Sequence, residues 1–292
     1  MQAQQFQLHA NIEEKHWWFV ARRRLMQAVL EQLVPPARAG RSLDQATVID
    51  VGCGTGANIA ALADRYHAVG IDASPEAIRF AVERYPNVDF RAGFAPDDLS
   101  DCLPQARAVM MMDVLEHVSD DFQLLSSVMA AAAPGTFFLL TVPADLALWS
   151  PHDESFGHYR RYDANRFRQL WKDLPVTERM LTPFNTRLYP LIRFIRSWNR
   201  RRTRSTGEVG TDFNVPRPWT NAALRWIFAG ERRRLLRSLN RDKRQGNLSS
   251  LGGVSLMAVL ERREGPLEVQ AKPAEAVDYF DPVAGQLIGA IG

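Results

Sequence analysis

The chain has 292 residues, of which 46% are hydrophobic and 24% charged, proportions typical of a folded globular protein. Its two cysteines, Cys53 and Cys102, form no CxxC pair, which argues against a disulfide framework and a structural zinc site. The N-terminus has neither the basic start nor the apolar run of a signal peptide, so we expect a cytoplasmic protein. The net charge is only +3, but residues 187–244 hold sixteen basic and four acidic residues, which suggests an anionic partner for that segment.

The predicted elements begin with a helix over residues 12–33, which Pro35 and Pro36 end. Strands and helices then alternate. Strands are expected at 47–51, 67–71, 88–92, 108–112 and 136–142. Three helices are expected between them. The first follows the glycine-rich turn and runs to about residue 65, the second begins at Ser74, and the third covers 120–133. The apolar stretch 126–149 could imitate a membrane span, but Pro134, Gly135 and Asp145 interrupt it.

This alternation predicts an α/β fold with a Rossmann-like, doubly wound and mostly parallel sheet. After a helix near 165–172, strand-like segments at 176–181 and 254–260 predict a late antiparallel strand. We expect four parts: an N-terminal helical lid (1–36), a core (37–184 and 250–263), a basic helical insertion or cap (185–249) and a C-terminal tail (264–292).

A glycine-rich turn, DVGCGTG, occupies residues 50–56 and follows the first strand. Gly52, Gly54 and Gly56 permit a tight turn and a close approach of backbone to ligand. The helix N-terminus behind them suits an anion. Asp72 closes the second strand, where a carboxylate can accept both hydroxyls of a ribose.

The glycine spacing alone does not separate cofactor classes, because Gly52, Gly54 and Ala57 also satisfy the dinucleotide fingerprint. Asp50 favours a different ligand. It lies just before the first glycine, where it can meet an ammonium group and would repel a pyrophosphate.

Three segments in this order, DVGCGTG, GIDAS (70–74) and DVLEHV (113–118), resemble the consecutive motifs of class I S-adenosylmethionine-dependent methyltransferases. EKHWWFVARRR (14–24) and SPHDESFGHYRRY (150–162) are similar to segments of a bacterial small-molecule subgroup of that family. The resemblance implies S-adenosylmethionine as the cofactor and S-adenosylhomocysteine as its product.

The same resemblance implies which residues bind the cofactor. They are Asp50, Gly52, Cys53, Gly54, Asp72, Ala73, Gly93, Phe94, Asp113 and His117. Gly93-Phe94 departs from the common pattern, in which an acidic residue binds the adenine amino group; Asp97 or Asp98 could take that role. Cys53 and Cys102 otherwise suit small packing positions.

The acceptor loop is SPHDESFGHYRRY, because ligands of open α/β sheets lie beyond the carboxyl ends of the strands. His152 and His158 are the candidate bases, with Asp153 or Glu154 to orient one of them. The candidate acceptor contacts are Trp18, Arg160, Arg161 and Tyr162. The alternative is a structural loop in which the arginines pair with the acids. We expect no metal, since adjacent residues such as His152, Asp153 and Glu154 rarely ligate one ion.

Two helices are expected in the basic segment, over 188–202 and 219–239. Leu188, Leu191, Ile192, Ile195 and Trp198 recur at helical spacing. The favoured interpretation is a cap over the acceptor site; the other is peripheral contact with an anionic membrane. Both interpretations merge for a lipid-linked acceptor.

The predicted function is methyl transfer to O or N of a small-molecule or lipid-linked acceptor. One alternative is an RNA or other nucleic-acid methyltransferase, prompted by the basic segment. Asp113-Val114-Leu115 stands where an exocyclic-amine enzyme has a Pro-Pro turn, and neither cysteine is placed for attack on cytosine C5, so we do not expect nucleic acid. A second alternative is a non-catalytic regulatory protein that binds S-adenosylmethionine, and a third, disfavoured by Asp50, is a nicotinamide oxidoreductase.

Overall fold

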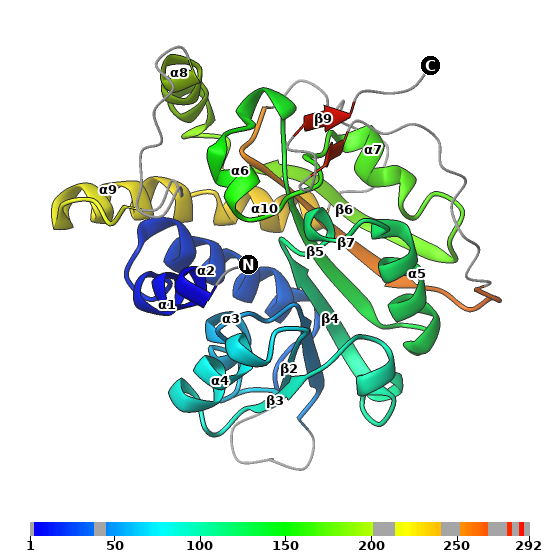
Figure 1. The fold of residues 1–292 in the computed structure, drawn as a ribbon. Coiled ribbons are helices and arrows are strands. Elements are labelled where there is room, and N and C mark those ends of the chain that lie inside the picture. The colour runs from blue at the N-terminus through cyan, green and yellow to red at the C-terminus, as the bar shows by residue number, and fades with distance from the viewer. Residues whose placement is uncertain are drawn as a thin grey trace.

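The computed structural model describes residues 3–37, 45–200, 214–240, 252–267, 279–281 and 286–288. Within those ranges, a seven-stranded sheet runs through the centre of the molecule (Figure 1). Its strands are β1 (Thr47–Val51), β2 (His67–Asp72), β3 (Asp89–Ala92), β4 (Ala106–Met112), β5 (Phe137–Pro143), β6 (Val176–Phe184) and β7 (Ser255–Arg262).

The strand order is β3-β2-β1-β4-β5-β7-β6. β7 is antiparallel to both of its neighbours, whereas the remaining pairs of this sheet are parallel. The predicted Rossmann-like, mostly parallel sheet with a late antiparallel strand is thus confirmed. A short hairpin of β8 (Tyr279–Asp281) and β9 (Gln286–Ile288) lies apart from it, in the predicted tail.

The helices of the described ranges are α1 (Ala3–Ile12), α2 (Trp17–Leu33), α3 (Ala57–Ala60), α4 (Pro75–Arg84), α5 (Asp121–Ala131), α6 (Pro151–Ser155), α7 (Ala164–Gln169), α8 (Tyr189–Arg200), α9 (Pro218–Ala229) and α10 (Arg232–Leu239). Single 3-10 turns occur at Asp97–Leu99, Leu103–Gln105, Leu115–His117 and Leu146–Leu148. No helix of the described residues combines the length and the apolar character that crossing a membrane requires.

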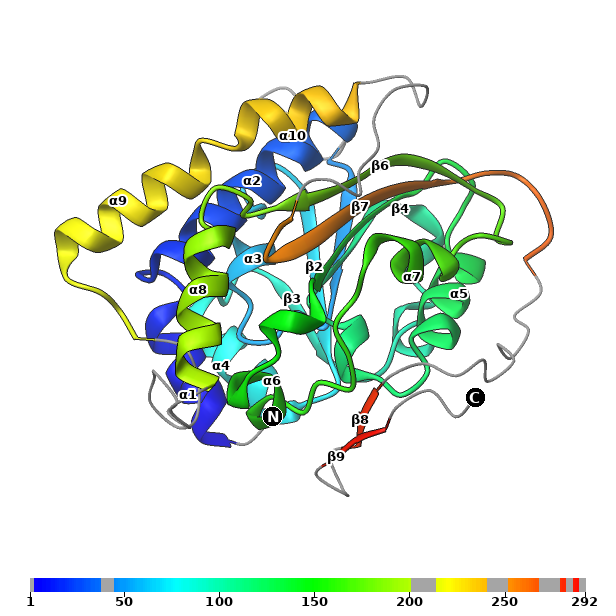
Figure 2. The same cartoon turned by 90° about the horizontal axis from the view of Figure 1, so that it is seen from above.

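Helices cover both faces of the sheet, because parallel strands are apolar on both sides (Figure 2). On one face, Leu125 and Val128 of α5 and Phe167 of α7 are fully buried against the strands. On the other face, Val29 of α2 and Leu235 of α10 are fully buried in a second apolar cluster. The sheet therefore separates two hydrophobic cores, and its six parallel strands end together at one edge.

The N-terminal helix differs from the prediction of one helix over residues 12–33. The structure has two helices, and the chain breaks between Ile12 and Trp17. The cause is a new N-cap: the His16 side chain accepts a hydrogen bond from the Trp18 backbone N–H, 3.3 Å away. Glu13 also leaves the helix and binds Thr55 Oγ1 at 2.7 Å.

Two other helix predictions need correction. After the glycine turn, α3 ends at Ala60, and turns rather than helix lead to residue 65. The predicted helix over 219–239 is divided at Gly230 and Glu231 into α9 and α10. Glu231 turns inward there, where its Oε1 accepts hydrogen bonds from the Thr186 and Arg187 backbone N–H groups at 2.7 and 3.0 Å.

The basic segment reaches back to the N-terminal helices. The Asn221 side chain of α9 accepts a hydrogen bond from the Trp17 N–H at 2.8 Å and donates one to the Lys15 carbonyl at 2.8 Å. α8 stands further out, above the carboxyl edge of the sheet (Figures 1 and 2). The last two residues of its predicted range, 201–202, lie outside the described residues.

Candidate active site

The glycine turn after β1 is built by positive backbone angles. Gly52 has φ 73° and Gly54 φ 55°. A Cβ on Gly52 would come within 2.5 Å of a Val114 methyl group, whereas a Cβ on Gly54 would meet nothing within 4 Å. The turn is therefore packed on the protein side at Gly52 and has open space beside Gly54, as a backbone that receives a ligand requires.

Asp50 lies beneath this turn rather than in the wall of a cavity. It is 1% exposed, and neither carboxyl oxygen has a hydrogen-bond partner among the described residues. Burial raises its pKa to about 7, partly offset by Arg22. An unpaired buried carboxyl group of this kind suits a ligand that brings a positive charge.

Asp72 braces the same turn. Its two carboxylate oxygens accept hydrogen bonds from the backbone N–H groups of Gly54 and Ser74, at 2.9 and 2.8 Å. Ala73 beside it is exposed. The sequence pattern placed Asp72 on the ribose; in this structure the carboxylate fixes the position of Gly54, and its contact with a ribose stays a prediction.

The Gly93-Phe94 segment follows β3 at the neighbouring strand end. Asp98 Oδ2 accepts a hydrogen bond from the Phe94 N–H at 2.8 Å, and a Cβ on Gly93 would come within 2.3 Å of the same oxygen. Phe94 is 69% exposed. Of the two acids suggested as substitutes for the missing adenine ligand, Asp98 is therefore the one that lies against this segment.

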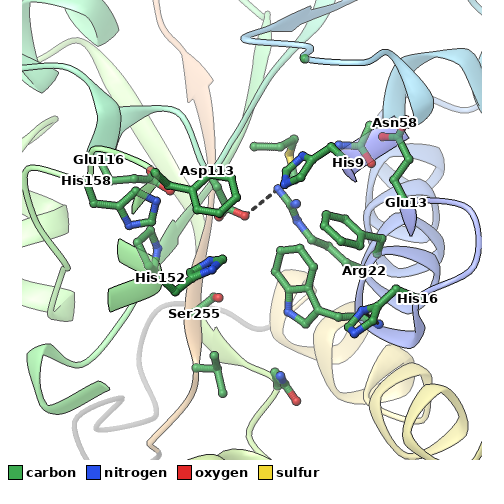
Figure 3. A pocket seen from close by; sticks show the side chains of 18 of the residues that line it. His9, Glu13, His16, Arg22, Asn58, Asp113, Glu116, His152, His158 and Ser255 are labelled. Atoms are coloured by element: carbon green, nitrogen blue, oxygen red, sulfur yellow. Dashed lines mark hydrogen bonds and ion pairs between the residues drawn. The ribbon is translucent and has the colours of Figure 1, made fainter. Parts of the chain in front are cut away.

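A cavity of about 440 Å³ opens beside the glycine turn (Figure 3). The predicted residues that line it are Gly52, Cys53, Gly54, Asp113, His117, His152, His158, Trp18 and Arg161. Asp50, Asp72, Ala73, Gly93 and Phe94 do not line it. The cavity thus joins the cofactor turn to the acceptor loop, while the ribose and adenine candidates lie along the adjoining strand ends.

Arg22 of α2 lines this cavity, although the sequence did not predict it as a site residue. Its guanidinium lies 2.9 Å from Asp113 Oδ2 (Figure 3). It also donates to Thr141 Oγ1 at 3.3 Å and stacks 4.7 Å from the centre of the Trp18 ring. Thr141 donates in turn to Asp113 Oδ1 at 2.9 Å. This network ties the second helix to the ends of β4 and β5.

The acceptor loop holds a histidine–aspartate pair. His158 Nδ1 and Asp153 Oδ1 are 3.0 Å apart. Asp153 is fully buried and also binds the Arg161 Nε, at 2.8 Å, and the Ser150 backbone N–H, at 2.9 Å. Although burial works against the charge, Arg161 and His158 hold the pKa of Asp153 well below its usual value. Both earlier interpretations meet here: Asp153 orients a histidine and also pairs with an arginine.

His152, the other candidate base, lines the cavity on a different side. Its ring centre is 4.6 Å from that of Phe156 and 6.3 Å from that of His158. Glu154, a candidate to orient a histidine, instead accepts a hydrogen bond from the Trp149 indole N–H at 3.2 Å. His158 is the histidine for which the structure shows a carboxylate against the ring, that of Asp153.

The structure separates the three predicted acceptor contacts Arg160, Arg161 and Tyr162. Arg160 is 5% exposed, and its guanidinium donates to the Val118 and Ser119 carbonyls, both at 2.7 Å. Tyr162 is 1% exposed and donates to Asp121 Oδ2 at 2.8 Å. Neither lines the cavity. Arg161 does, but Asp153 and the Ala144 carbonyl take up its donors.

Glu116 and His117, in the turn after β4, also line the cavity. Glu116 is fully buried, and neither of its carboxyl oxygens has a partner among the described residues. Burial, with Asp113 nearby, raises the pKa of Glu116 well above its usual value. Burial and His158 lower the pKa of His117 well below its usual value.

Other polar residues that line the cavity were also not predicted from the sequence. They are His9, Glu13, His16, Asn58, Glu116, Asn185 and Ser255. Burial lowers the pKa of His9 and of His16 to about 4, so both are neutral imidazoles. Glu116 stands inside the DVLEHV motif and could have been singled out there. Asn185 and Ser255 carry no signal of their own.

Residues 19–175 match the methyltransferase domain family. Among curated relatives, a probable S-adenosylmethionine-dependent methyltransferase of Mycolicibacterium smegmatis is 28% identical over 165 residues, which cover 54% of this chain and 59% of the relative. A ubiquinone biosynthesis O-methyltransferase of Xylella fastidiosa is 35% identical over 36% of this chain and 46% of its own length. The alignments thus span little more than half of the first relative and less than half of the second.

The solved structure of the plantazolicin methyltransferase BpumL, in complex with S-adenosylhomocysteine, is similar in fold. Its TM-score is 0.51 at 12% identity, with 89% of this chain and 90% of that chain covered. The family match covers more than half of the sequence, and the predicted sheet and glycine turn are present in the structure. The chain is therefore a member of the class I S-adenosylmethionine-dependent methyltransferase family.

Proposed function

We propose that this protein transfers a methyl group from S-adenosylmethionine to an oxygen or nitrogen of a small-molecule or lipid-linked acceptor. The observation that carries the proposal is the shared cavity, which Gly52, Gly54 and His158 all line, with Asp153 bound behind His158. The relatives named above include an O-methyltransferase, which supports an oxygen acceptor.

The residues fit this cofactor. Gly54 leaves space for a ligand close to the backbone, and the buried carboxyl group of Asp50 favours a cationic group nearby. The sulfonium supplies an already activated methyl group, so positioning accounts for much of the catalysis. Cys53 is buried, and burial keeps its pKa well above the usual value, so it is a packing residue rather than a nucleophile.

His158 is the residue we propose to take the proton of an acceptor hydroxyl. Asp153 binds its Nδ1, which leaves Nε2 as the nitrogen for the acceptor. His152, which lines the same cavity beside Phe156, is proposed to contact the acceptor. The Arg22–Asp113 pair lies between the acceptor side and the glycine turn and is proposed to close the site.

The N-terminal helices and α8 are proposed to serve as lid and cap. Trp17 and Trp18 of α2 and Ile192, Ile195 and Arg196 of α8 all line the cavity. Four apolar side chains of α8 and the neighbouring α9 are exposed: Leu191 is 52%, Phe194 64%, Trp219 71% and Trp226 77% exposed. Apolar residues beside arginines at the mouth of the cavity support an acceptor with a lipid chain and contact with an anionic membrane.

The test is methyl transfer from isotopically labelled S-adenosylmethionine to a panel of phenols, hydroxy acids, carboxylic acids and amines, with and without prenyl chains, followed by mass spectrometry. We expect one class to gain the label. Asp72→Ala is the control: loss of its hydrogen bonds to Gly54 and Ser74, and to a bound ribose, should weaken binding of S-adenosylhomocysteine by about 1.5–3 kcal/mol. The proposal fails if wild-type protein binds NAD but neither S-adenosyl compound in calorimetry.

A further inference from the structure

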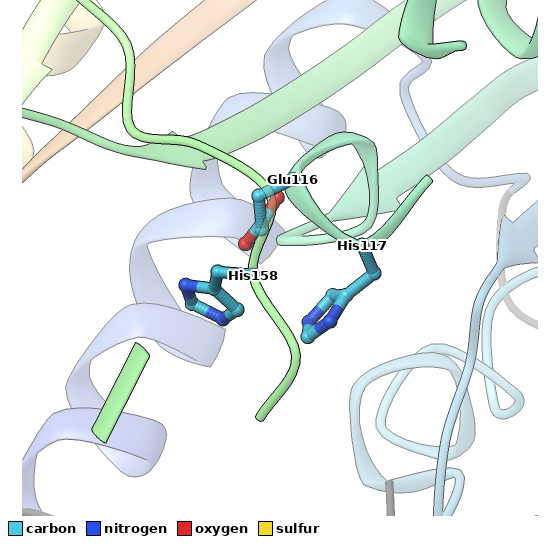
Figure 4. A group of neighbouring side chains, drawn as sticks. All are labelled: Glu116, His117 and His158. Atoms are coloured by element: carbon cyan, nitrogen blue, oxygen red, sulfur yellow. The ribbon is translucent and has the colours of Figure 1, made fainter. Parts of the chain in front are cut away.

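Glu116, His117 and His158 form a cluster at one wall of the cavity (Figure 4). One ligand-type atom of each side chain lies within 4.8 Å of those of the other two. Glu116 and His117 come from the turn after β4, and His158 from the loop after α6. The two imidazole rings meet edge to face, with centres 4.6 Å apart. The fold thus brings a carboxylate and two imidazoles together from two separate segments.

One ring nitrogen of His158 is held by a buried carboxylate. Asp153 binds His158 Nδ1 at 3.0 Å, and Asp153 is itself fixed by Arg161 and by the Ser150 N–H. Histidines that ligate metals have this arrangement, in which the outer nitrogen donates to a carboxylate or a carbonyl and the inner nitrogen is left for the ion.

Glu116 supplies a second, independent observation. It is fully buried, both of its oxygens lack a partner among the described residues, and Figure 4 shows its carboxyl group directed toward His158. A buried carboxylate without a partner is unfavourable unless a positive charge is brought to it. Asp113, the nearest other acid in this turn, is already paired with Arg22 and Thr141.

We propose that Glu116, His117 and His158 bind a divalent transition-metal cation such as Zn²⁺, Mn²⁺ or Fe²⁺. Two imidazoles and one carboxylate suit these ions rather than Mg²⁺ or Ca²⁺. Ligands at about 2.0–2.2 Å from the ion stand roughly 3–3.5 Å from one another, so the cluster contracts slightly from its present spacing when the ion binds. Three protein ligands leave coordination positions open toward the cavity.

This inference deepens the proposed function and rests on it for the role of the ion. An acceptor oxygen that enters an open position would be bound beside the methyl donor and would ionise more readily. With the ion bound, His158 Nε2 would be its ligand, and the acceptor's proton would pass to water; the role of His158 as proton acceptor applies to the site without the ion. The acceptor class that fits is a compound with an ionisable hydroxyl group, and a neighbouring oxygen would add a second bond to the ion.

The test is cation binding by the full chain, freed of any purification tag and treated with EDTA. Co²⁺ is titrated by visible absorption and Zn²⁺ by calorimetry. We expect one equivalent to bind to the wild type, and Glu116→Gln and His117→Ala each to weaken binding at least about tenfold. His152→Ala is the matched control: it removes an imidazole of the same cavity outside the cluster and should leave Co²⁺ affinity unchanged.

Melting curves and S-adenosylhomocysteine binding show whether each variant is folded. If His117→Ala does not fold, His158→Asn takes its place in the cation titration. The inference is overturned if the wild type binds no stoichiometric Co²⁺, or if folded Glu116→Gln and His117→Ala bind it as tightly as the wild type. Methyl transfer that persists in EDTA would then leave the proposed function standing. Failure of S-adenosylhomocysteine to bind would instead count against the proposed function, whatever the cation does.

Discussion

At the scale of single residues, Asp50 is the group whose protonation is most tightly linked to folding. Arg22, Asp72 and Cys53 are the ionisable groups that interact with it, from α2, the end of β2 and the glycine turn. Burial outweighs the attraction to Arg22 and raises the pKa of Asp50 from 3.8 to about 7. The folded protein therefore holds a proton on Asp50 at pH values where the unfolded chain has lost it.

The consequence is a specific pH dependence. A folded-state pKa above the unfolded one gives stability that is complete below about pH 4 and is lost as pH rises through about 7. Asp50→Asn removes this titration. We expect the variant to gain free energy of unfolding relative to the wild type between pH 5 and pH 8, by at most about 4 kcal/mol for a shift of this size. Denaturant unfolding without cofactor at several pH values measures it.

The control for this pH dependence is Asp72→Asn. It changes a carboxylate that braces the same turn, but the oxygens of Asp72 are already hydrogen-bonded to Gly54 and Ser74. A stability difference between wild type and Asp50→Asn that is the same at pH 5 and pH 8 would show that Asp50 is ionised throughout.

Site residues could be predicted from the sequence where a backbone conformation requires glycine or where a motif follows a strand. Gly52 and Gly54 were found because only glycine fits a turn of this kind, and Asp113 and His117 because a motif places them after a strand. Arg160 and Arg161 were not separable, since neighbouring side chains leave the chain in different directions and the sequence does not say which faces the cavity. Arg161 reaches it and Arg160 does not.

At the scale of elements, the attachment of α2 depends on Arg22. This residue joins Asp113 after β4 and Thr141 of β5, and its side chain is only 6% exposed. Pairs buried to this degree are costly to break from one side, because the remaining charge is left without its partner. The pair therefore helps to hold the N-terminal helices over the cavity.

A double-mutant cycle tests this attachment. We expect Arg22→Ala and Asp113→Ala each to destabilise the cofactor-free protein, and the double variant to lose less than the sum, with a coupling energy of about 1–3 kcal/mol. Urea unfolding supplies the four free energies. Arg79→Ala with Glu83→Ala, an exposed pair on α4, is the matched cycle and should couple by less than about 1 kcal/mol. Additive losses for Arg22 and Asp113 would mean that the pair does not hold the helices.

Strands were easier to predict than helix boundaries. β1 begins and ends where its apolar run does, because a buried parallel strand is apolar throughout. The N-terminal helix was predicted as one piece, because its apolar pattern continues across residues 13–16, where the structure breaks it. The break depends on His16 and on the contact of Glu13 with Thr55, a residue distant in sequence that no local pattern identifies.

At the scale of the whole molecule, the exposed apolar side chains gather on the basic segment. Leu191, Phe194 and Trp198 recur along one side of α8, and Trp219 and Trp226 are seven positions apart on α9. Arg193, Arg217 and Arg225 stand among them in sequence. Aromatic residues with arginines beside them are typical of surfaces that contact anionic lipids. Since Ile195 both lines the cavity and is 43% exposed, this surface adjoins the mouth of the cavity.

We therefore expect the protein to sediment with vesicles of phosphatidylglycerol and phosphatidylcholine at low salt, and much less at high salt or with phosphatidylcholine alone, because salt screens arginine–lipid attraction beyond about 10 Å at 0.1 M. Phe194→Ser removes an exposed ring from α8 and should lower the bound fraction, since burial of that ring in the lipid contributes to binding. Val82→Ser, at an exposed apolar position on α4, is the matched control and should bind as the wild type does. Equal sedimentation of the wild type with both vesicle types at low salt would exclude an anionic membrane as the partner of this surface, and the exposed residues of α8 would then have to be assigned to the acceptor itself.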